Sequence, residues 1–266
     1  MPELTAEPPS EQREHEPLPA MGFLDHLEEL RKRIIYSIIA VAFGFGASWW
    51  KVERIYDVMQ RPIMAALRAN GMSEKLVYLN PTEPFNLYLK IAALAGLFLT
   101  SPFVLYQVWM FISPGLYRNE KRYVVPFMVS TITLFTTGGY FGYKIAYPRA
   151  LEFLIHFGRQ FQPMITIGEY TQLFLSIVLG MGLIFEMPIL VFFLSFMGIV
   201  SPGFMLKNFR YAILVIFIVA AIVTPTPDIV NMCIFAAPMV ALYALSVGIA
   251  WLVHPKQRRA RREKRA

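Results

Sequence analysis

Hydrophobic residues occur along this chain in long runs that contain almost no Asp, Glu, Lys or Arg. A helix needs about 20 predominantly apolar residues to cross the roughly 30 Å hydrocarbon core of a bilayer. The runs lack the alternating pattern of barrel strands, and a backbone in lipid must satisfy its own hydrogen bonds. They therefore predict six transmembrane helices, at about residues 34–50, 88–111, 123–143, 170–197, 211–224 and 229–253.

The fifth predicted span is unusually short. Its helix is limited by Pro225 and Pro227 to about 13 residues, from Tyr211 to Val223, or roughly 20 Å. A helix of this length can span only where the bilayer thins or where the helix ends snorkel.

The composition supports a membrane protein and excludes a soluble one. Hydrophobic residues make up 56% of the 266 residues and charged residues 16%, whereas an ordinary soluble domain is about 25% charged. The single cysteine, Cys233, excludes a disulfide framework and a CxxC motif. The formal net charge is +7, but seven of the 25 basic residues lie in the last eleven positions, beside a hydrophobic run. That placement favours an anionic membrane surface over nucleic acid as the partner.

The distribution of basic residues predicts the topology. Six spans put both termini on one side of the membrane, and with the termini inside, sixteen of the 25 basic residues are cytoplasmic. Because short cytoplasmic segments carry the excess of Lys and Arg, both termini are expected in the cytoplasm. The predicted fold is an all-α polytopic membrane protein in which six helices form a concave wall with structured outer loops.

The ends of the chain differ from its core. Residues 1–20 are acidic and rich in proline, so they are expected to be a disordered tail. Residues 21–253 form the predicted six-span core, and residues 254–266 form a basic cytoplasmic tail. Within the core, the apolar spacing of residues 21–33 predicts a short interfacial helix that leads into the first span.

The first outer segment, residues 51–90, is expected to be structured. Apolar residues recur in it at helical spacing on both sides of Pro62. This pattern predicts short helices that cap the outer face, with Pro62 marking the break between them.

Catalytic motifs are absent from the sequence. The chain has no H-E-x-x-H motif, and its four histidines, His15, His26, His156 and His254, all lie at or outside the predicted membrane boundary. Its glycine pairs lie within predicted spans, where small residues permit close helix packing, as at Gly138. We therefore expect a binding or transport protein, not an enzyme, with no metal and no cofactor.

Glu186 is the only ionisable residue well inside a predicted span. A carboxylic acid at this depth is costly, so it should face protein or water. Pro188 removes a helical hydrogen bond two residues later and favours a kink there. Two interpretations remain open: Glu186 is bonded to a neighbouring helix of the chain, or it makes a polar contact with a substrate or with a partner helix.

Two further acids, Glu29 and Glu120, lie among basic residues on the predicted cytoplasmic side. They could form local salt bridges at i,i+3 or i,i+4 spacing. Alternatively, they could bind a guanidinium ligand, because a carboxylate accepts the two hydrogen bonds of an arginine fork.

These residues belong to a series of short motifs along the chain. The motifs are His26-Leu-Glu-Glu-Leu-Arg-Lys-Arg33, Ser101-Pro102, Tyr106-Gln-Val-Trp109, Phe111, Pro114-Gly-Leu-Tyr117, Glu120-Lys-Arg122, Phe185-Glu-Met-Pro188 and Thr224-Pro-Thr-Pro-Asp228. Their order and topological positions, from residue 21 to about residue 253, resemble those of the twin-arginine translocase subunit TatC family.

The resemblance implies a receptor in a bacterial or archaeal cytoplasmic membrane. Such a receptor binds twin-arginine signal peptides at its cytoplasmic face. It assembles with TatA-type and TatB-type single-span proteins and exports folded proteins using the proton-motive force. The implied signal-peptide residues are Glu29, Glu120, Arg31, Phe111 and Arg122; Glu186 is the implied intramembrane contact, and Pro62, Pro188 and Asp228 have structural or functional roles. Self-association is left open.

Two other functions were weighed against the receptor. In a proton-coupled solute transporter, Glu186 would act as a proton relay, although a relay usually needs a chain of intramembrane acids or histidines and this chain has one. The second alternative is a purely structural membrane scaffold.

Overall fold

The computed structural model describes residues 23–73, 75–112, 124–158, 160–161, 164–196, 198–224 and 229–253. Its elements are α1 (Phe23–Trp49), α2 (Val52–Ala69), α3 (Glu83–Ile112), α4 (Val124–Phe141), the π-helical turn η4 (Gly142–Ala146), α5 (Tyr147–Phe157), α6 (Ile167–Ile184), α7 (Met187–Phe196), α8 (Pro202–Lys207), α9 (Phe209–Val223) and α10 (Ile229–Val253). The described part of the chain contains no strand, only an isolated bridge between Val77 and Thr166. The protein is therefore built almost entirely of helices, as the apolar runs predict.

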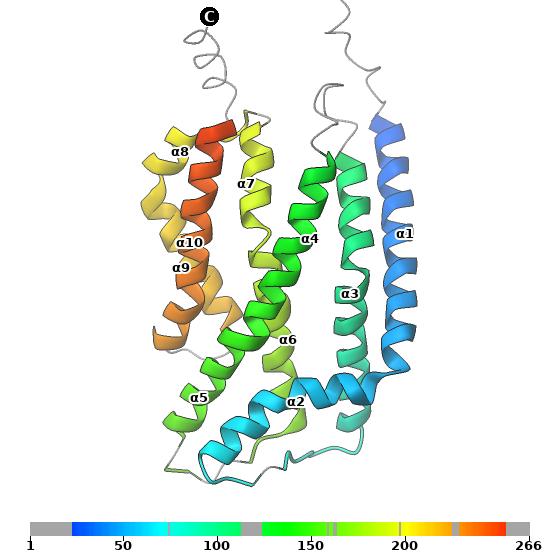
Figure 1. Cartoon of the computed structure of the whole chain (residues 1–266), viewed down its shortest axis with the longest axis vertical. Helices are drawn as coiled ribbons and strands as arrows, with labels where there is room; N and C mark the ends of the chain where they lie inside the picture. The colour runs from blue at the N-terminus through cyan, green and yellow to red at the C-terminus, as the bar shows by residue number, and fades with distance from the viewer. Residues whose placement is uncertain are drawn as a thin grey trace, which may run out of the picture.

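The long helices run up and down along one axis (Figure 1). The start of α1, the end of α3, the start of α4 and the end of α10 lie at the end drawn at the top, here called the upper end. Helix α2 and the end of α5 lie at the opposite, lower end. The first residue of α1 and the last residue of α10 therefore lie at the same end of the molecule.

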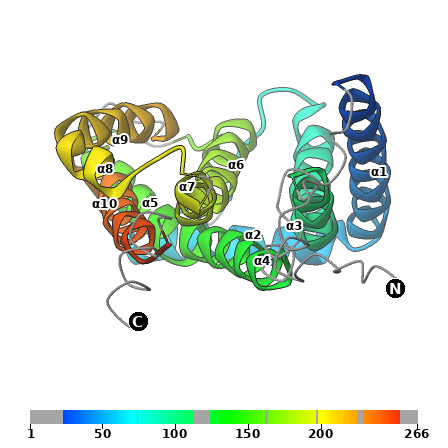
Figure 2. The ribbon, with the colours of Figure 1, turned by 90° about the horizontal axis from the view of Figure 1, so that it is seen from above.

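Seen from above, the helices form a curved row and not a closed bundle (Figure 2). At one end of the row α1 packs mainly on α3, and at the other end α9 packs mainly on α10. Between them, α4 packs on α6, and α7 packs on α10. The outermost helices thus leave large apolar faces uncovered, as at Ile38 and Phe43 of α1, which are 62% and 80% exposed.

Several described helices are apolar enough to cross a membrane. Three are also long enough on their own, at Glu83–Phe111, Ile167–Ser195 and Met232–Trp251, and α1 joined to α2 forms a fourth candidate with an 82° bend. Helix α9 has only 15 residues, in agreement with the short fifth segment of the sequence. The count of six crossings and the side of the membrane on which the termini lie remain predictions.

Helix α2 corrects one prediction, because Pro62 lies inside a single helix and does not break it. Proline has no N–H, so Pro62 cannot donate to the carbonyl of Val58 one turn earlier. The hydroxyl of Tyr143 donates to that carbonyl instead, at 2.7 Å. Burial of Met59 and Ile63 against the core then holds α2 across the lower ends of the other helices.

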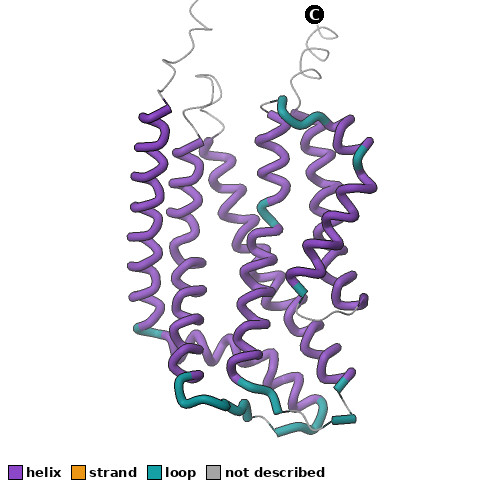
Figure 3. Tube along the Cα trace, turned by 180° about the vertical axis from the view of Figure 1, so that it is seen from behind, coloured by secondary structure: helices purple, strands orange, loops and turns teal. Residues whose placement is uncertain are grey.

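The loop after α2 is anchored by backbone hydrogen bonds. The N–H of Val77 donates to the carbonyl of Ile165 at 3.0 Å, and the N–H of Ile167 donates to the carbonyl of Val77 at 2.8 Å. This pairing joins the loop before α3 to the loop before α6, in the teal region at the lower end of Figure 3. The prediction that the first outer segment is structured is therefore confirmed for its described residues.

The short interfacial helix expected at residues 21–33 is not a separate element, because α1 runs without a break from Phe23 to Trp49 and includes the first predicted span. Two predicted spans also differ from the observed helices. The third continues beyond residue 143, because η4 adds one wide turn and leads directly into α5, which ends at Phe157. The fourth is divided at Phe185 and Glu186 between α6 and α7. That division agrees with the expected effect of Pro188, which is fully buried in the first turn of α7.

Glycines permit the closest helix contacts, as expected for helices packed in a membrane. A methyl group added at Gly44 of α1 would lie 2.7 Å from the carbonyl oxygen of Gly96 in α3. One added at Gly138 of α4 would lie 2.5 Å from the carbonyl oxygen of Met181 in α6. Any side chain at either position would push the paired helices apart.

Candidate functional site

Two of the three carboxylates in the first two turns of α1, those of Glu28 and Glu29, lie in different environments. Glu28 pairs with Lys32 at 2.8 Å, and both side chains are more than half exposed. The hydrogen bond and the charge of Lys32 hold the pKa of Glu28 below its ordinary value. Glu29 pairs with Arg33 at 3.1 Å, but the Glu29 side chain is only 16% exposed. The structure therefore contains the local i,i+4 salt bridge that was one of the two interpretations of Glu29.

Arg33 joins this carboxylate to α3. One guanidinium nitrogen donates to Glu29 Oε1 at 3.1 Å, and the other donates to the side-chain oxygen of Gln107 at 2.9 Å. Gln107 is buried, so its amide fixes the position of the guanidinium. Gln107 was not singled out by its sequence position, although it lies inside the Tyr106-Gln-Val-Trp109 motif.

The second carboxylate oxygen of Glu29 is the distinctive feature of this cluster. Oε2 is buried, and no hydrogen-bond donor reaches it among the residues that the structure describes. A buried acceptor without a donor costs about 1 to 3 kcal/mol, and more when the group is charged. Among the described residues, Glu29 therefore has one oxygen engaged by Arg33 and one oxygen that no donor reaches.

An aromatic pair lies beside the carboxylate on the same two helices. The rings of His26 and Phe111 are stacked with centroids 4.4 Å apart and planes inclined by 18°. Arg31, two residues after Glu29 in α1, is exposed to solvent. The structure thus brings Glu29, Phe111 and Gln107 together where the start of α1 meets the end of α3, at the upper end (Figure 1).

Three of the predicted site residues lie outside the described part of the chain. They are Glu120 and Arg122, which follow α3, and Asp228, which precedes α10. The two tails, residues 1–20 and 254–266, also lie outside it.

Glu186 lies at the break between α6 and α7 and is half-buried. Its Oε1 atom is buried, and no hydrogen-bond partner is found for it among the described residues. The backbone N–H groups of Ile189 and Leu190 both donate to the Glu186 carbonyl, each at 3.1 Å, so α7 starts from this residue. The described helices therefore supply no internal cation for this carboxyl group.

Trp109 connects the two regions. Its indole N–H donates to the hydroxyl of Thr131 in α4 at 3.1 Å, and its ring meets Phe193 of α7 edge-on at 5.7 Å. Trp109 is buried and two residues before Phe111. A displacement of the end of α3 would therefore alter its contacts with α4 and with α7, the helix that starts directly after Glu186.

Comparison with known proteins identifies a family. The family model described as "Sec-independent protein translocase protein (TatC)" matches residues 25–238. A TatC protein of Koribacter versatilis is 65% identical over 99% of this chain and 97% of its own length. The TatC protein of Desulforapulum autotrophicum is 39% identical over 88% of this chain and 85% of its own length. A crystal structure described as the twin-arginine translocase receptor TatC is 34% identical, has a TM-score of 0.75, and covers 86% of this chain and 99% of that one.

Proposed function

The chain belongs to the TatC family of Sec-independent protein translocase proteins, and from this premise we propose that it binds twin-arginine signal peptides. The binding site in this proposal is the upper end of α1 and α3, which faces the cytoplasm, with both termini on that side. The cargo then crosses the bacterial inner membrane in the folded state.

The observation that carries the proposal is the free oxygen of Glu29. A guanidinium forms strong charge-assisted hydrogen bonds to carboxylate oxygens, and its planar set of donors is not reproduced by the ammonium of lysine. Glu29 Oε2 is a buried acceptor without a donor among the described residues, on a carboxylate that Arg33 and Gln107 already hold in position. An arginine of the signal peptide would supply the missing donor.

The neighbouring residues have complementary roles in this proposal. Phe111, stacked on His26, offers an aromatic surface beside the carboxylate. Arg31 and Arg122 repel stray cations, so that only a ligand able to engage the acids enters. Glu120 is proposed as the second carboxylate for the arginine pair.

Electrostatic contacts alone are too weak for a receptor. Hydrogen bonds to charged groups contribute about 1.5 to 3 kcal/mol each, whereas micromolar affinity requires about 8 kcal/mol beyond the entropy lost on association. The apolar stretch of the signal peptide must therefore also bury surface. The curved row of helices offers exposed apolar side chains for this contact, such as Phe103 of α3.

The partners and the energy source are further parts of the proposal. TatA-type and TatB-type single-span proteins would contribute a transmembrane helix that contacts Glu186, and the proton-motive force would drive transport. Pro188 supports this role by opening the helix at Glu186. A solute transporter with Glu186 as a proton relay is not favoured, because the family is one of protein translocase components.

Photocrosslinking tests the location of the site. A photoreactive residue placed at Leu27, which is 45% exposed near Glu29 on α1, should capture a twin-arginine peptide added to the purified protein. The matched control is Tyr78, which is 56% exposed in the loop after α2 at the lower end. Capture at Tyr78 but not at Leu27 would overturn the proposed location.

A further inference from the structure

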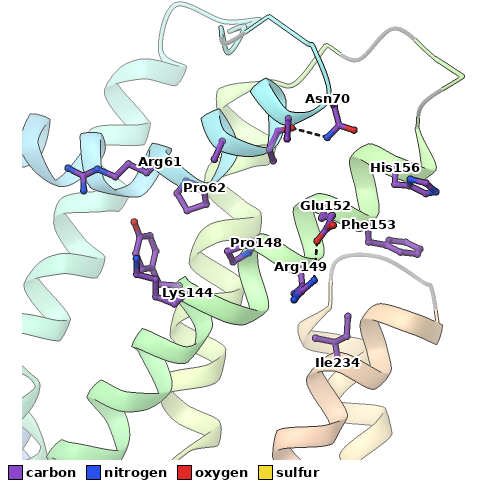
Figure 4. Close-up of a pocket in the computed structure, with 14 residues that line it drawn as sticks. Arg61, Pro62, Asn70, Lys144, Pro148, Arg149, Glu152, Phe153, His156 and Ile234 are labelled. Carbon is purple, nitrogen blue, oxygen red and sulfur yellow. Dashed lines mark hydrogen bonds and ion pairs between the residues drawn. The ribbon is translucent and has the colours of Figure 1, made fainter.

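A basic groove lies at the lower end of the molecule, between α2, the segment from η4 to α5, and α10. Its volume is about 900 Å³. Figure 4 shows Arg61 and Lys144 toward one end of the groove, with Arg149 and His156 toward the other. Small side chains create the space, because α2 presents Ala65, Ala66 and Ala69 to it.

Two of the basic side chains of this groove form no ion pair within the described part of the chain. Arg61 and Lys144 are exposed, and neither forms an ion pair with a described carboxylate. Lys144 lies over the ring of Tyr143, with its ammonium 5.6 Å from the ring centroid. Two cationic groups from different helices therefore face the same space, and no described carboxylate pairs with either of them.

Glu152 is the only acid that lines the groove among the described residues, and it is a weak competitor. It pairs with Arg149 at 3.3 Å, but the two side chains are 66% and 69% exposed, so water screens their attraction. An anionic ligand could redirect Arg149 at little cost. Apart from His156, the groove carries the three positive charges of Arg61, Lys144 and Arg149 and the one negative charge of Glu152.

The orientation of α2 places this groove at the surface of a membrane. Helix α2 turns by 82° from α1 and has one buried apolar face and one charged face. Its apolar face packs on the protein core, so α2 lies across the lower ends of the long apolar helices, at the level that the lipid headgroups occupy around them (Figure 1). Apolar lining from Pro148, Phe153 and Ile234 adjoins the basic groups, so a ligand with a charged head and an apolar body matches the site.

We propose that this groove binds the headgroup of an anionic phospholipid, with the phosphate held by Arg61, Lys144 and Arg149 and the acyl chains directed along α5 and α10. The membrane is the source of the ligand in this proposal, because the groove lies at the level of the phospholipid headgroups. Its basic side chains adjoin an apolar surface, as the phosphate of a lipid adjoins its acyl chains. Basic pockets between membrane helices bind phosphate headgroups by this chemistry. The inference is independent of the signal-peptide site at the upper end.

The test compares two variants with the same change of charge. The groove variant is Arg61→Gln/Lys144→Gln/Arg149→Gln. The control variant is Lys51→Gln/Arg54→Gln/Lys90→Gln, which removes three exposed basic residues of the same part of the molecule that do not line the groove. Native mass spectrometry and titration with phosphatidylglycerol, with phosphatidylcholine as the zwitterionic reference, would measure lipid bound per protein molecule.

The wild-type protein should retain phosphatidylglycerol in preference to phosphatidylcholine. The groove variant should lose one tightly bound phosphatidylglycerol and bind it about tenfold or more weakly, whereas the control variant should retain it. Ala65→Trp, which fills the groove without changing charge, should also displace this lipid and serves if the triple variant misfolds. Equal losses in the groove and control variants, retention in Ala65→Trp, or equally tight binding of water-soluble glycerophosphoglycerol would each overturn the proposal.

Discussion

The hydroxyl of Tyr143 donates a hydrogen bond of 2.7 Å to the backbone carbonyl of Val58, across 85 positions of the sequence. That carbonyl is the one that Pro62 leaves without its helical donor. Tyr143 lies in η4, where the wide π turn interrupts the regular spacing of side chains. The bond therefore explains how α2 continues through a proline and is attached to the third predicted span.

Tyr143→Phe should lower the free energy of unfolding by about 0.5 to 1.5 kcal/mol, the usual contribution of one hydrogen bond. Pro62→Ala restores an N–H donor for Val58, so Tyr143→Phe should cost less in a Pro62→Ala background. Thermal unfolding of the four proteins in detergent measures this coupling. Additive effects of the two substitutions would contradict the account.

Tyr170 provides a matched comparison for that experiment. Its hydroxyl donates to the carbonyl of Met59 at 2.7 Å. The residue one turn after Met59 in α2 is Ile63, which, unlike Pro62, has an N–H that can serve as the helical donor for that carbonyl. Tyr170→Phe should therefore destabilise α2 less than Tyr143→Phe does.

Gly44→Ala should destabilise the protein by about 1 to 3 kcal/mol, because the added methyl group meets the backbone of Gly96 and cannot be accommodated by a rotamer change. Gly46→Ala is the control in the same helix, since a methyl group there meets nothing within 4 Å. That substitution should be neutral or stabilising by up to about 1 kcal/mol. Equal melting temperatures for the two variants would show that α1 and α3 do not pack as described.

Much of this fold could be predicted from local sequence. Apolar runs predicted the long helices, and the helical spacing of apolar residues on both sides of Pro62 predicted short helices after the first span. The break assigned to Pro62 was wrong, because a tyrosine hydroxyl distant in sequence satisfies the carbonyl that proline leaves free. The extension of the third span to Phe157 was also missed, since a π turn has no recognised sequence pattern.

The candidate site was predictable only in part for the same reason. The spacing of Glu29 and Arg33 allowed a local salt bridge, which the structure contains. The hydrogen bond from Arg33 to Gln107 joins residues 74 positions apart, and only packing of α1 on α3 brings them together. The half-satisfied state of Glu29 depends on that packing, so sequence spacing could not indicate it.

Glu186→Gln should reduce export only mildly, because an amide still forms hydrogen bonds to a partner helix. Glu186→Ala removes the hydrogen-bonding group, so the partner helix should bind less firmly or in a shifted position. The loss should be small, because hydrogen bonds in membranes contribute on average about 0.6 kcal/mol and reach roughly 1.7 kcal/mol. Export assays and cysteine crosslinking measure the two effects. Met187 is the better crosslinking position, because it is 38% exposed whereas Phe185 packs against Phe141.

A proton relay gives the opposite pattern for these variants. Glutamine cannot carry the proton, so Glu186→Gln and Glu186→Ala would be equally inactive. Loss of export in both variants, with crosslinks intact, would contradict the partner-helix account.

The most direct test of the central claim is the affinity ratio of a twin-arginine signal peptide to its double-lysine counterpart, measured on the purified protein. The account predicts that the wild-type protein prefers the arginine peptide by about tenfold or more, because a guanidinium presents several N–H donors in a fixed plane, one of which can bond to Glu29 Oε2, whereas the ammonium of lysine is a compact point charge. Glu29→Gln should bring the ratio close to one, whereas Glu28→Gln, which removes the neighbouring exposed carboxylate of the same helix, should leave it unchanged. Equal affinity of the wild-type protein for both peptides, or an equal fall of the ratio in both variants, would contradict the claim that Glu29 recognises the arginine pair.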